Sequence, residues 1–197
     1  LELVAVHTGS ELKDADPGGP CAVQYILDYL EPLGTDRIVY SGLEREDEDT
    51  FLRHFEALNR CAAQCAEQGV HVLYHNHAHE FEDDAFIMRT ILEDGAPELK
   101  LCPDIGWVHR AGADVMEFLK EAKDRLGALH FKDFADMDTD PHIVRLGEGE
   151  VPLREAAEWT RENAPGLWVM AEQDTPDGSP EEAVRANARF LRQVFPA

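Results

Sequence analysis

Short apolar runs alternate with amphipathic segments along the chain. Six runs rich in β-branched and apolar residues predict strands, at residues 2–7, 37–41, 71–77, 99–104, 128–133 and 167–174. Between these runs, apolar residues recur at the three- and four-residue spacing of a helix. Strand followed by helix, repeated without a hairpin signal, predicts a parallel sheet whose faces are covered by helices.

The helical segments show both a buried stripe and end signals. Five apolar stripes predict the buried helix faces: Val23, Ile26, Leu27, Leu30 and Leu33; Leu52, Phe55, Leu58, Ala62 and Cys65; Ile87, Ile91 and Leu92; Val115, Phe118, Leu119 and Ala122; and Val184, Ala188, Leu191 and Val194. Glycines follow the stripes, where a left-handed residue ends a helix, at positions 34, 69, 95, 127 and 166. Ser179 and Glu182 are spaced as a capping box at the start of the last helix.

Two architectures accommodate repeated βα units: an open doubly wound sheet and most of a (β/α)8 barrel. No GxGxxG follows the first predicted strand, so the usual dinucleotide-binding signal is missing. Polar residues end nearly every predicted strand instead of gathering at one switch point, as expected for a barrel with its site at the C-terminal strand ends. We therefore predict an α/β fold of the TIM-barrel type, with residues 1–197 forming one domain of about six βα units.

Composition narrows the class of partner. The 197 residues include 40 acidic and 18 basic ones, which gives a formal net charge of −22. Such a field repels phosphate backbones and anionic lipids, so neither nucleic acid nor a membrane surface is the expected partner. The sequence holds four cysteines without a CxxC pattern. Cys61 and Cys65 lie one helical turn apart on an alanine-rich face, which favours buried reduced thiols and a cytoplasmic location.

Polar side chains share one parity at the ends of the predicted strands. Side chains alternate along a strand, and this alternation directs one set of polar residues inward. The set comprises His7, Ser41, His75, His77, Asp104, His130, Lys132 and Glu172. Glu80 lies just beyond the end of its strand. Carboxylates together with imidazole form a ligand set for a divalent ion such as Mn²⁺, Mg²⁺ or Co²⁺. Each residue also has a structural alternative, because Asp104 could cap a helix, Lys132 could be a surface cation and a strand-end histidine could be a hydrogen-bonded rim residue.

Five motifs in order resemble the sugar phosphate isomerase/epimerase family of xylose-isomerase-like TIM barrels, which also contains inosose dehydratases and ketose 3-epimerases. They are YHNHAHEFE at 74–82, CPDIGWVHRAGAD at 102–114, LHFKDF at 129–134, RLGEGEVPL at 145–153 and WVMAEQD at 168–174. The resemblance implies that Asp104, His130 and Glu172 bind a divalent metal, with Zn²⁺ as a further possible ion. It leaves the first ligand open between Glu80 and His75, because ketose epimerase relatives have Glu-Asn-His where this chain has His75-Asn76-His77; we favour Glu80.

The resemblance also implies an incomplete barrel. The chain begins where the third strand of the family would lie, so we expect the first two βα units to be missing or their place to be covered by another chain, because unpaired strand edges are exposed otherwise. Association of such barrels through their helices makes a homodimer a further expectation.

The leading prediction is a metal-dependent isomerase or epimerase. It would act on a keto sugar, a keto polyol or a sugar phosphate through an enediolate, with Glu172 and Glu80 removing and returning the proton. Lys132 would stabilise the developing oxyanion, while His7, His75, His77 and Trp107 would contact the carbohydrate.

Three alternatives remain. A lyase similar to inosose dehydratase would use the same enolate, an endonuclease would need a basic surface, and an inactive binding fragment would hold no tight metal ion.

Overall fold

The computed structural model describes residues 3–8, 21–45, 47–136, 142–176 and 178–196. The chain divides into two compact units, Leu1–Cys102 and Pro103–Ala197. Among the described helices, none combines the length and the apolar character that a membrane crossing requires. The prediction of one domain over the whole chain stays a prediction.

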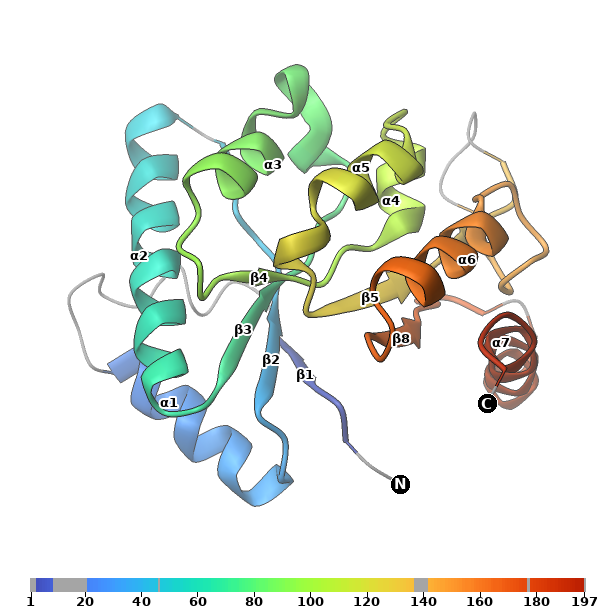
Figure 1. Ribbon diagram of the computed structural model, residues 1–197, viewed down its shortest axis with the longest axis horizontal. Helices are drawn as coiled ribbons and strands as arrows, with labels where there is room; N and C mark the ends of the chain where they lie inside the picture. The colour runs from blue at the N-terminus through green and yellow to red at the C-terminus, as the bar shows by residue number, and fades with distance from the viewer. Residues whose placement is uncertain (1–2, 9–20, 46, 137–141, 177, 197) are drawn as a thin grey trace. The chain divides into compact units, whose positions relative to one another are not determined.

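The first unit is built on a parallel sheet of four strands in the order β1-β2-β3-β4. Its helices α1 and α2 lie side by side on one side of these strands (Figure 1). The elements, in chain order, are β1 (Val6–Thr8), α1 (Cys21–Leu30), the 3-10 turn η2 (Glu31–Leu33), β2 (Arg37–Tyr40), α2 (Glu48–Glu67), β3 (His71–Tyr74), the 3-10 turn η3 (His79–Phe81), α3 (Glu82–Asp94) and β4 (Lys100–Leu101).

Helix α2 shows how the pattern of apolar residues fixes this unit. Its N-cap Asp47 accepts a hydrogen bond from the backbone N–H of Thr50, which satisfies an otherwise unpaired donor of the first turn. The helix then buries Phe55, Leu58 and Cys65 at helical spacing, as the sequence predicts. These side chains pack on the strands, and α2 makes its sheet contacts mainly with β3.

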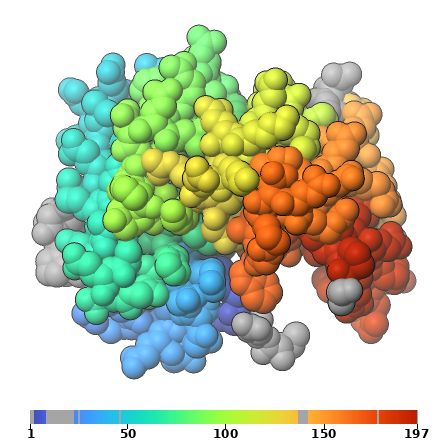
Figure 2. Space-filling view, in the orientation of Figure 1, coloured from blue at the N-terminus to red at the C-terminus, as the bar shows by residue number. Residues whose placement is uncertain are grey.

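The second unit contains the remaining strands and four helices. Strands β5 and β8 pair in parallel, and the short strands β6 and β7 pair antiparallel. The elements are α4 (Ile105–Arg110), α5 (Val115–Glu121), the 3-10 turn η4 (Lys123–Arg125), β5 (Ala128–Phe131), β6 (Asp133–Phe134), β7 (Ile143–Val144), α6 (Leu153–Asn163), β8 (Trp168–Ala171) and α7 (Pro180–Val194). Figure 2 shows α7 in red beside the orange surface of α6 and β8, which it contacts.

All six predicted strands are present, but three local predictions were wrong. The antiparallel pair β6–β7 is a hairpin-like feature that the sequence did not signal, because each strand has only two residues. Helix α7 buries Ala183, Asn187 and Phe190 in place of the first three residues of the predicted stripe, and Val184 is 67% exposed. Val194, the last residue of that stripe, is buried as predicted. Ser179 occupies the N-cap position of α7 but makes no side-chain capping bond.

The glycines predicted to end helices agree with the structure at three positions and differ from it at two. Gly34, Gly69 and Gly166 have positive φ, as predicted, whereas Gly95 has φ −64°. Gly127 is also absent from the positive-φ glycines of the described residues. Cys61 and Cys65 are buried free thiols, which confirms the prediction for this pair, and Cys102 is a buried free thiol as well. The Cys21 side chain lies outside the described part of the structure.

Candidate functional site

The strand register of the second unit gathers polar side chains at one edge. Parallel pairing sets Phe131 opposite Ala171, so the chain leaves β5 and β8 at the same level. The backbone N–H of Glu172 donates to the carbonyl of Phe131 over 2.9 Å. His130 in β5, Lys132 after β5 and Glu172 after β8 therefore lie together, because the carboxyl ends of parallel strands meet at one edge.

Asp104 joins this group through backbone pairing. It forms a parallel bridge with His130, whose backbone N–H donates to the carbonyl of Pro103 over 2.8 Å. The side chains of Asp104, His130 and Glu172 each offer one ligand atom, and these atoms lie within 4.8 Å of one another. His130 Nδ1 contacts Glu172 Oε2 directly. The second unit thus brings together the three residues that the sequence assigned to the metal.

Lys132 lies between three carboxylates. Its Nζ is 2.9 Å from Glu172 Oε1, 2.9 Å from Asp174 Oδ2 and 3.4 Å from Asp104 Oδ2. The Lys132 side chain is 1% exposed, so the alternative of a surface cation is wrong. Burial lowers the pKa of the Lys132 ammonium, but the charges of Asp104 and Glu172 raise it, and the net shift is upward. Lys132 is therefore held as a cation.

The charge balance of the group fits a divalent cation. Three carboxylate groups face one ammonium, so acidic groups outnumber the basic one around Lys132 Nζ. Burial raises the pKa of Asp104 to about 7, even though Lys132 lies beside it. A buried carboxylate is stable when it is paired or coordinates a metal. Oxygen and imidazole donors suit Mn²⁺, Co²⁺ or Zn²⁺, so Asp104, His130 and Glu172 could hold such an ion.

The two oxygens of Asp104 have different partners, one in a helix cap and one in the candidate site. Its Oδ1 accepts hydrogen bonds from the backbone N–H groups of Gly106 and Trp107, at 2.9 and 3.2 Å, and so caps α4. Its Oδ2 is the atom that faces Lys132. Because the cap fixes the orientation of the carboxyl group, one oxygen is positioned toward the candidate metal ligands.

Gly106 allows α4 to approach the backbone of Lys132, which lies between β5 and β6. A Cβ at this position would lie 2.6 Å from the carbonyl oxygen of Lys132, and a backbone atom has little freedom to move away. We expect Gly106→Ala to lower the free energy of unfolding by about 1–3 kcal/mol, as over-packed buried positions do. Urea denaturation measures this, and Ala111→Ser at the end of the same helix should change it by less than about 0.5 kcal/mol.

Trp107 follows Gly106 on α4 and lies against the same group. The Lys132 Nζ is 5.0 Å from the centroid of the Trp107 ring, within the range of a cation–π contact. The ring also packs against Phe134, with centroids 5.0 Å apart. The assignment of Trp107 to substrate contact stays a prediction, and the structure places it beside the Lys132 ammonium.

The first unit gathers the other predicted polar residues. His7 Nε2 lies 3.2 Å from Ser41 Oγ, and the rings of His7 and His75 have centroids 4.8 Å apart. The ring centroids of His75 and His77 lie 5.0 Å apart. Glu80 accepts hydrogen bonds from the Tyr74 hydroxyl over 2.8 Å and from the His77 backbone N–H over 2.7 Å.

Three functional candidates escaped the sequence interpretation. Asp174 contacts Lys132, and it has the same parity as Glu172, so strict alternation could have found it. The sequence interpretation assigned no role to His79, whose Nδ1 lies 3.3 Å from Glu80 Oε2. Asp133 was overlooked because it sits within an apolar run, although a buried carboxylate there requires partners.

Asp133 organises the loop that follows β7. Its Oδ2 accepts from the backbone N–H groups of Gly147 and Gly149, at 2.8 and 3.0 Å. Its Oδ1 accepts from those of Phe134 and Val151, both at 3.1 Å. The fully buried side chain of Asp133 therefore links the GEGE segment, residues 147–150, to β6, which begins next to Lys132.

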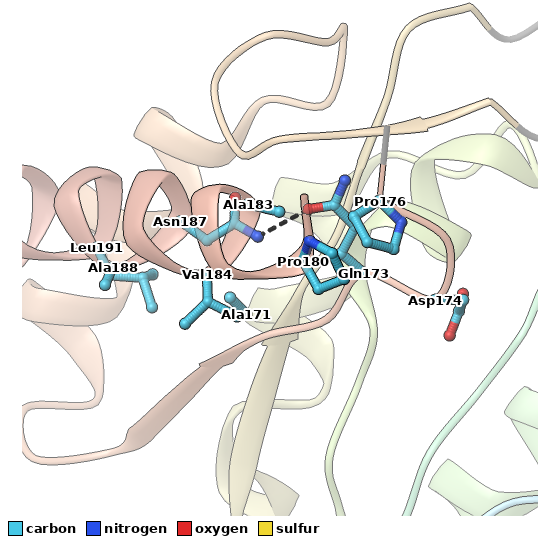
Figure 3. A pocket seen from close by; sticks show the side chains of 10 residues that line it. All are labelled: Ala171, Gln173, Asp174, Pro176, Pro180, Ala183, Val184, Asn187, Ala188 and Leu191. Atoms are coloured by element: carbon cyan, nitrogen blue, oxygen red, sulfur yellow. Dashed lines mark hydrogen bonds between the residues drawn. The ribbon is translucent and has the colours of Figure 1, made fainter. Parts of the chain in front are cut away.

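A hollow of about 520 Å³ lies between β8, the segment after it and α7 (Figure 3). Its walls are mainly apolar, from residues such as Ala171, Val184 and Leu191. Asn187 Nδ2 donates to Gln173 Oε1 over 3.0 Å across this region. Asp174 at its edge also bonds Lys132, so the hollow adjoins the candidate site through that residue.

Comparison with known proteins identifies the family to which the chain is similar. The profile of the family described as "Xylose isomerase-like TIM barrel" matches residues 22–194. An inosose dehydratase of Lacticaseibacillus casei is 24% identical over 174 residues, which cover 79% of this chain and 58% of that protein. The chain thus spans less than two thirds of that relative.

Two solved structures share the fold. A sugar phosphate isomerase/epimerase from Parabacteroides distasonis superposes with a TM-score of 0.75 at 20% identity, covering 100% of this chain and 73% of that one. The IOLI protein, whose structure is described with a binding zinc atom, superposes with a TM-score of 0.73 at 18% identity. The match covers 100% of this chain and 78% of the IOLI chain.

The chain belongs to the xylose isomerase-like TIM barrel family. This confirms both the resemblance drawn from the five motifs and the α/β fold of the TIM-barrel type. Sugar isomerases, epimerases and dehydratases are among its relatives.

Proposed function

We propose that the protein is a divalent-metal-dependent enzyme that enolises a keto sugar, a keto polyol or a phosphate ester of one. The observation that supports this best is the joint placement of Asp104, His130 and Glu172 around the buried ammonium of Lys132. Metal ligands and a fixed cation at one place suit a reaction in which negative charge develops on oxygen. The two dissimilar relatives, an isomerase/epimerase and a dehydratase, are compatible with a shared enolisation step.

The ion would be held by Asp104, His130 and Glu172, and as a Lewis acid it would acidify the C–H next to a carbonyl. Glu172 is the proposed base, because its Oε1 is already placed by Lys132 and its Oε2 by His130. Lys132 would donate a hydrogen bond to the enediolate oxygen, since a buried ammonium stabilises such charge more strongly than a solvated one. Trp107 would offer its ring to the apolar face of the sugar.

The proposal does not use Glu80 as the second base. Its two oxygens accept from Tyr74 and from the backbone of His77, and its side chain is fully buried. The prediction that Glu80 or His75 supplies a further ligand therefore stays a prediction. His7 and His75 remain candidates for binding sugar hydroxyls, because imidazole nitrogens can both donate and accept hydrogen bonds.

A dehydratase is the second candidate, favoured by the identity shared with inosose dehydratase. Both reactions begin with the same proton removal and differ in what the enediolate does next. Reprotonation of the same carbon from the opposite face gives an epimer, whereas expulsion of a β-hydroxyl gives an enone. Product analysis by ultraviolet absorption and NMR separates these outcomes.

Exchange of substrate C–H for deuterium from solvent tests the proposal. We expect a panel of ketohexoses, keto-inositols and their phosphates to include one substrate whose α-proton exchanges, because enolisation is common to both candidate reactions. Treatment with a chelator should abolish the exchange, and added Mn²⁺, Co²⁺ or Zn²⁺ should restore it. Exchange that persists in the chelated protein would contradict the proposal, as would its absence with every compound in the presence of metal.

A further inference from the structure

The segment after β3 contains a group of potential metal ligands within the first unit. His77, His79 and Glu80 each offer one ligand atom, and these atoms lie within 4.8 Å of one another. The rings of His77 and His79 are nearly parallel, with centroids 6.0 Å apart. The two histidines are half-buried and Glu80 is fully buried. Such a group has a solvent-facing side for entry of an ion and a buried side that fixes it.

Hydrogen bonding sets the orientation of His79. Its Nε2 lies 3.0 Å from the carbonyl oxygen of Leu43, and a carbonyl can only accept, so Nε2 carries the proton. The other ring nitrogen, Nδ1, then has its lone pair 3.3 Å from Glu80 Oε2. Two acceptors at this separation repel each other unless a proton on Nδ1 or a metal ion lies between them. A histidine that donates one N–H to a backbone carbonyl and directs the other nitrogen outward is the usual arrangement of a metal ligand.

Glu80 is oriented in the same way. The Tyr74 hydroxyl donates to Oε1, and the His77 backbone N–H donates to Oε2. A carboxylate has about four lone-pair positions, so each oxygen retains capacity for another partner.

The spacing suits a tetrahedral ion. With ligand bonds of about 2.0–2.1 Å, adjacent ligand atoms of a tetrahedral site lie roughly 3.3 Å apart. This matches the separation of 3.3 Å between His79 Nδ1 and Glu80 Oε2. We propose that His77, His79 and Glu80 form a second divalent-metal site that shares no residue with Asp104, His130 and Glu172. Two imidazoles and one carboxylate select Zn²⁺ or Co²⁺ over Mg²⁺ or Ca²⁺ and leave one position for water.

A metal ion at this site would connect three segments of the first unit. His77 follows β3, Glu80 and His79 lie in η3, and the Leu43 carbonyl belongs to the segment after β2. A bound ion would therefore stabilise the folded unit by mass action, independently of the reaction proposed above.

Zinc binding to the full chain tests the inference, with Zn²⁺ alone as the probe. Equilibrium dialysis and elemental analysis should give about two ions per chain in the wild type, about one in Asp104→Asn, and about none in Asp104→Asn combined with His79→Gln. X-ray absorption at the zinc edge should detect two imidazoles around the ion in Asp104→Asn. His71→Gln, at an exposed histidine outside the group, should leave the count unchanged.

Two results would overturn the inference: no zinc bound by Asp104→Asn, or equal binding with and without His79→Gln in that background. If circular dichroism shows that His79→Gln does not fold, Glu80→Gln in the same background gives the same comparison. Failure of the proposed reaction is distinguishable, because a chain that binds two ions but exchanges no substrate proton loses only the enzymatic proposal.

Discussion

Glu172→Gln is expected to lower the rate of solvent-deuterium exchange by about 10²–10⁴-fold, the usual contribution of a positioned general base. Glutamine has nearly the same size as glutamate, so packing is preserved, but its amide cannot take up a proton. The amide also replaces one oxygen next to His130 and Lys132, both of which contact the Glu172 carboxylate. Exchange measured by NMR at saturating metal separates the loss of the base from weaker metal binding.

Asp174→Asn is the matched control for this change. The Asp174 carboxylate contacts the same Lys132 Nζ at the same distance, 2.9 Å, but its side chain is 54% exposed. Water can replace it, so we expect a loss of less than about tenfold, in keeping with the small contribution of exposed ion pairs. Equal rates in Glu172→Gln and Asp174→Asn would remove Glu172 from the role of base.

Asp133→Ala is expected to lower the free energy of unfolding by about 3–4 kcal/mol. The substitution leaves four backbone N–H donors without their acceptor, those of Phe134, Gly147, Gly149 and Val151. An unsatisfied buried donor costs about 1–3 kcal/mol, and water entering the loop would recover part of the total. Urea denaturation followed by circular dichroism measures the change.

Asp133→Asn provides the graded comparison. Its amide oxygen can still accept from two of the four donors, whereas its NH₂ group faces the other two. We expect roughly half the loss of Asp133→Ala. An alanine variant as stable as the wild type would show that the GEGE loop does not depend on this carboxylate.

The alternation rule explains why much of the candidate site could be predicted from sequence. Strand side chains alternate strictly, so a polar residue at the end of an apolar run has a defined direction once the strand is placed. This rule located His130, Lys132 and Glu172, which the structure brings together in the second unit. Asp104 was found because it ends the run before α4; its predicted capping of that helix is confirmed, and its role as a metal ligand stays a prediction.

Other features depend on contacts that no local pattern encodes. The β6–β7 pair has two residues in each strand, which is too short to show a period. Helix α7 exposes Val184 and buries Asn187, because Asn187 Oδ1 accepts from the backbone N–H of Leu146 over 3.0 Å. A hydrophobic stripe cannot anticipate such a bond. The orientation of His79 could not be predicted for the same reason, since its partner Leu43 lies in a distant segment of the sequence.

Crystals soaked with Mn²⁺ and measured at the manganese absorption edge would test the central claim most directly. The account predicts an anomalous-scattering peak within about 2.0–2.3 Å of a carboxylate oxygen of Asp104, a carboxylate oxygen of Glu172 and a ring nitrogen of His130, at distances normal for divalent ions. The peak should vanish in Asp104→Asn. A fully soaked crystal without density among these three side chains would contradict the claim that they bind a catalytic metal.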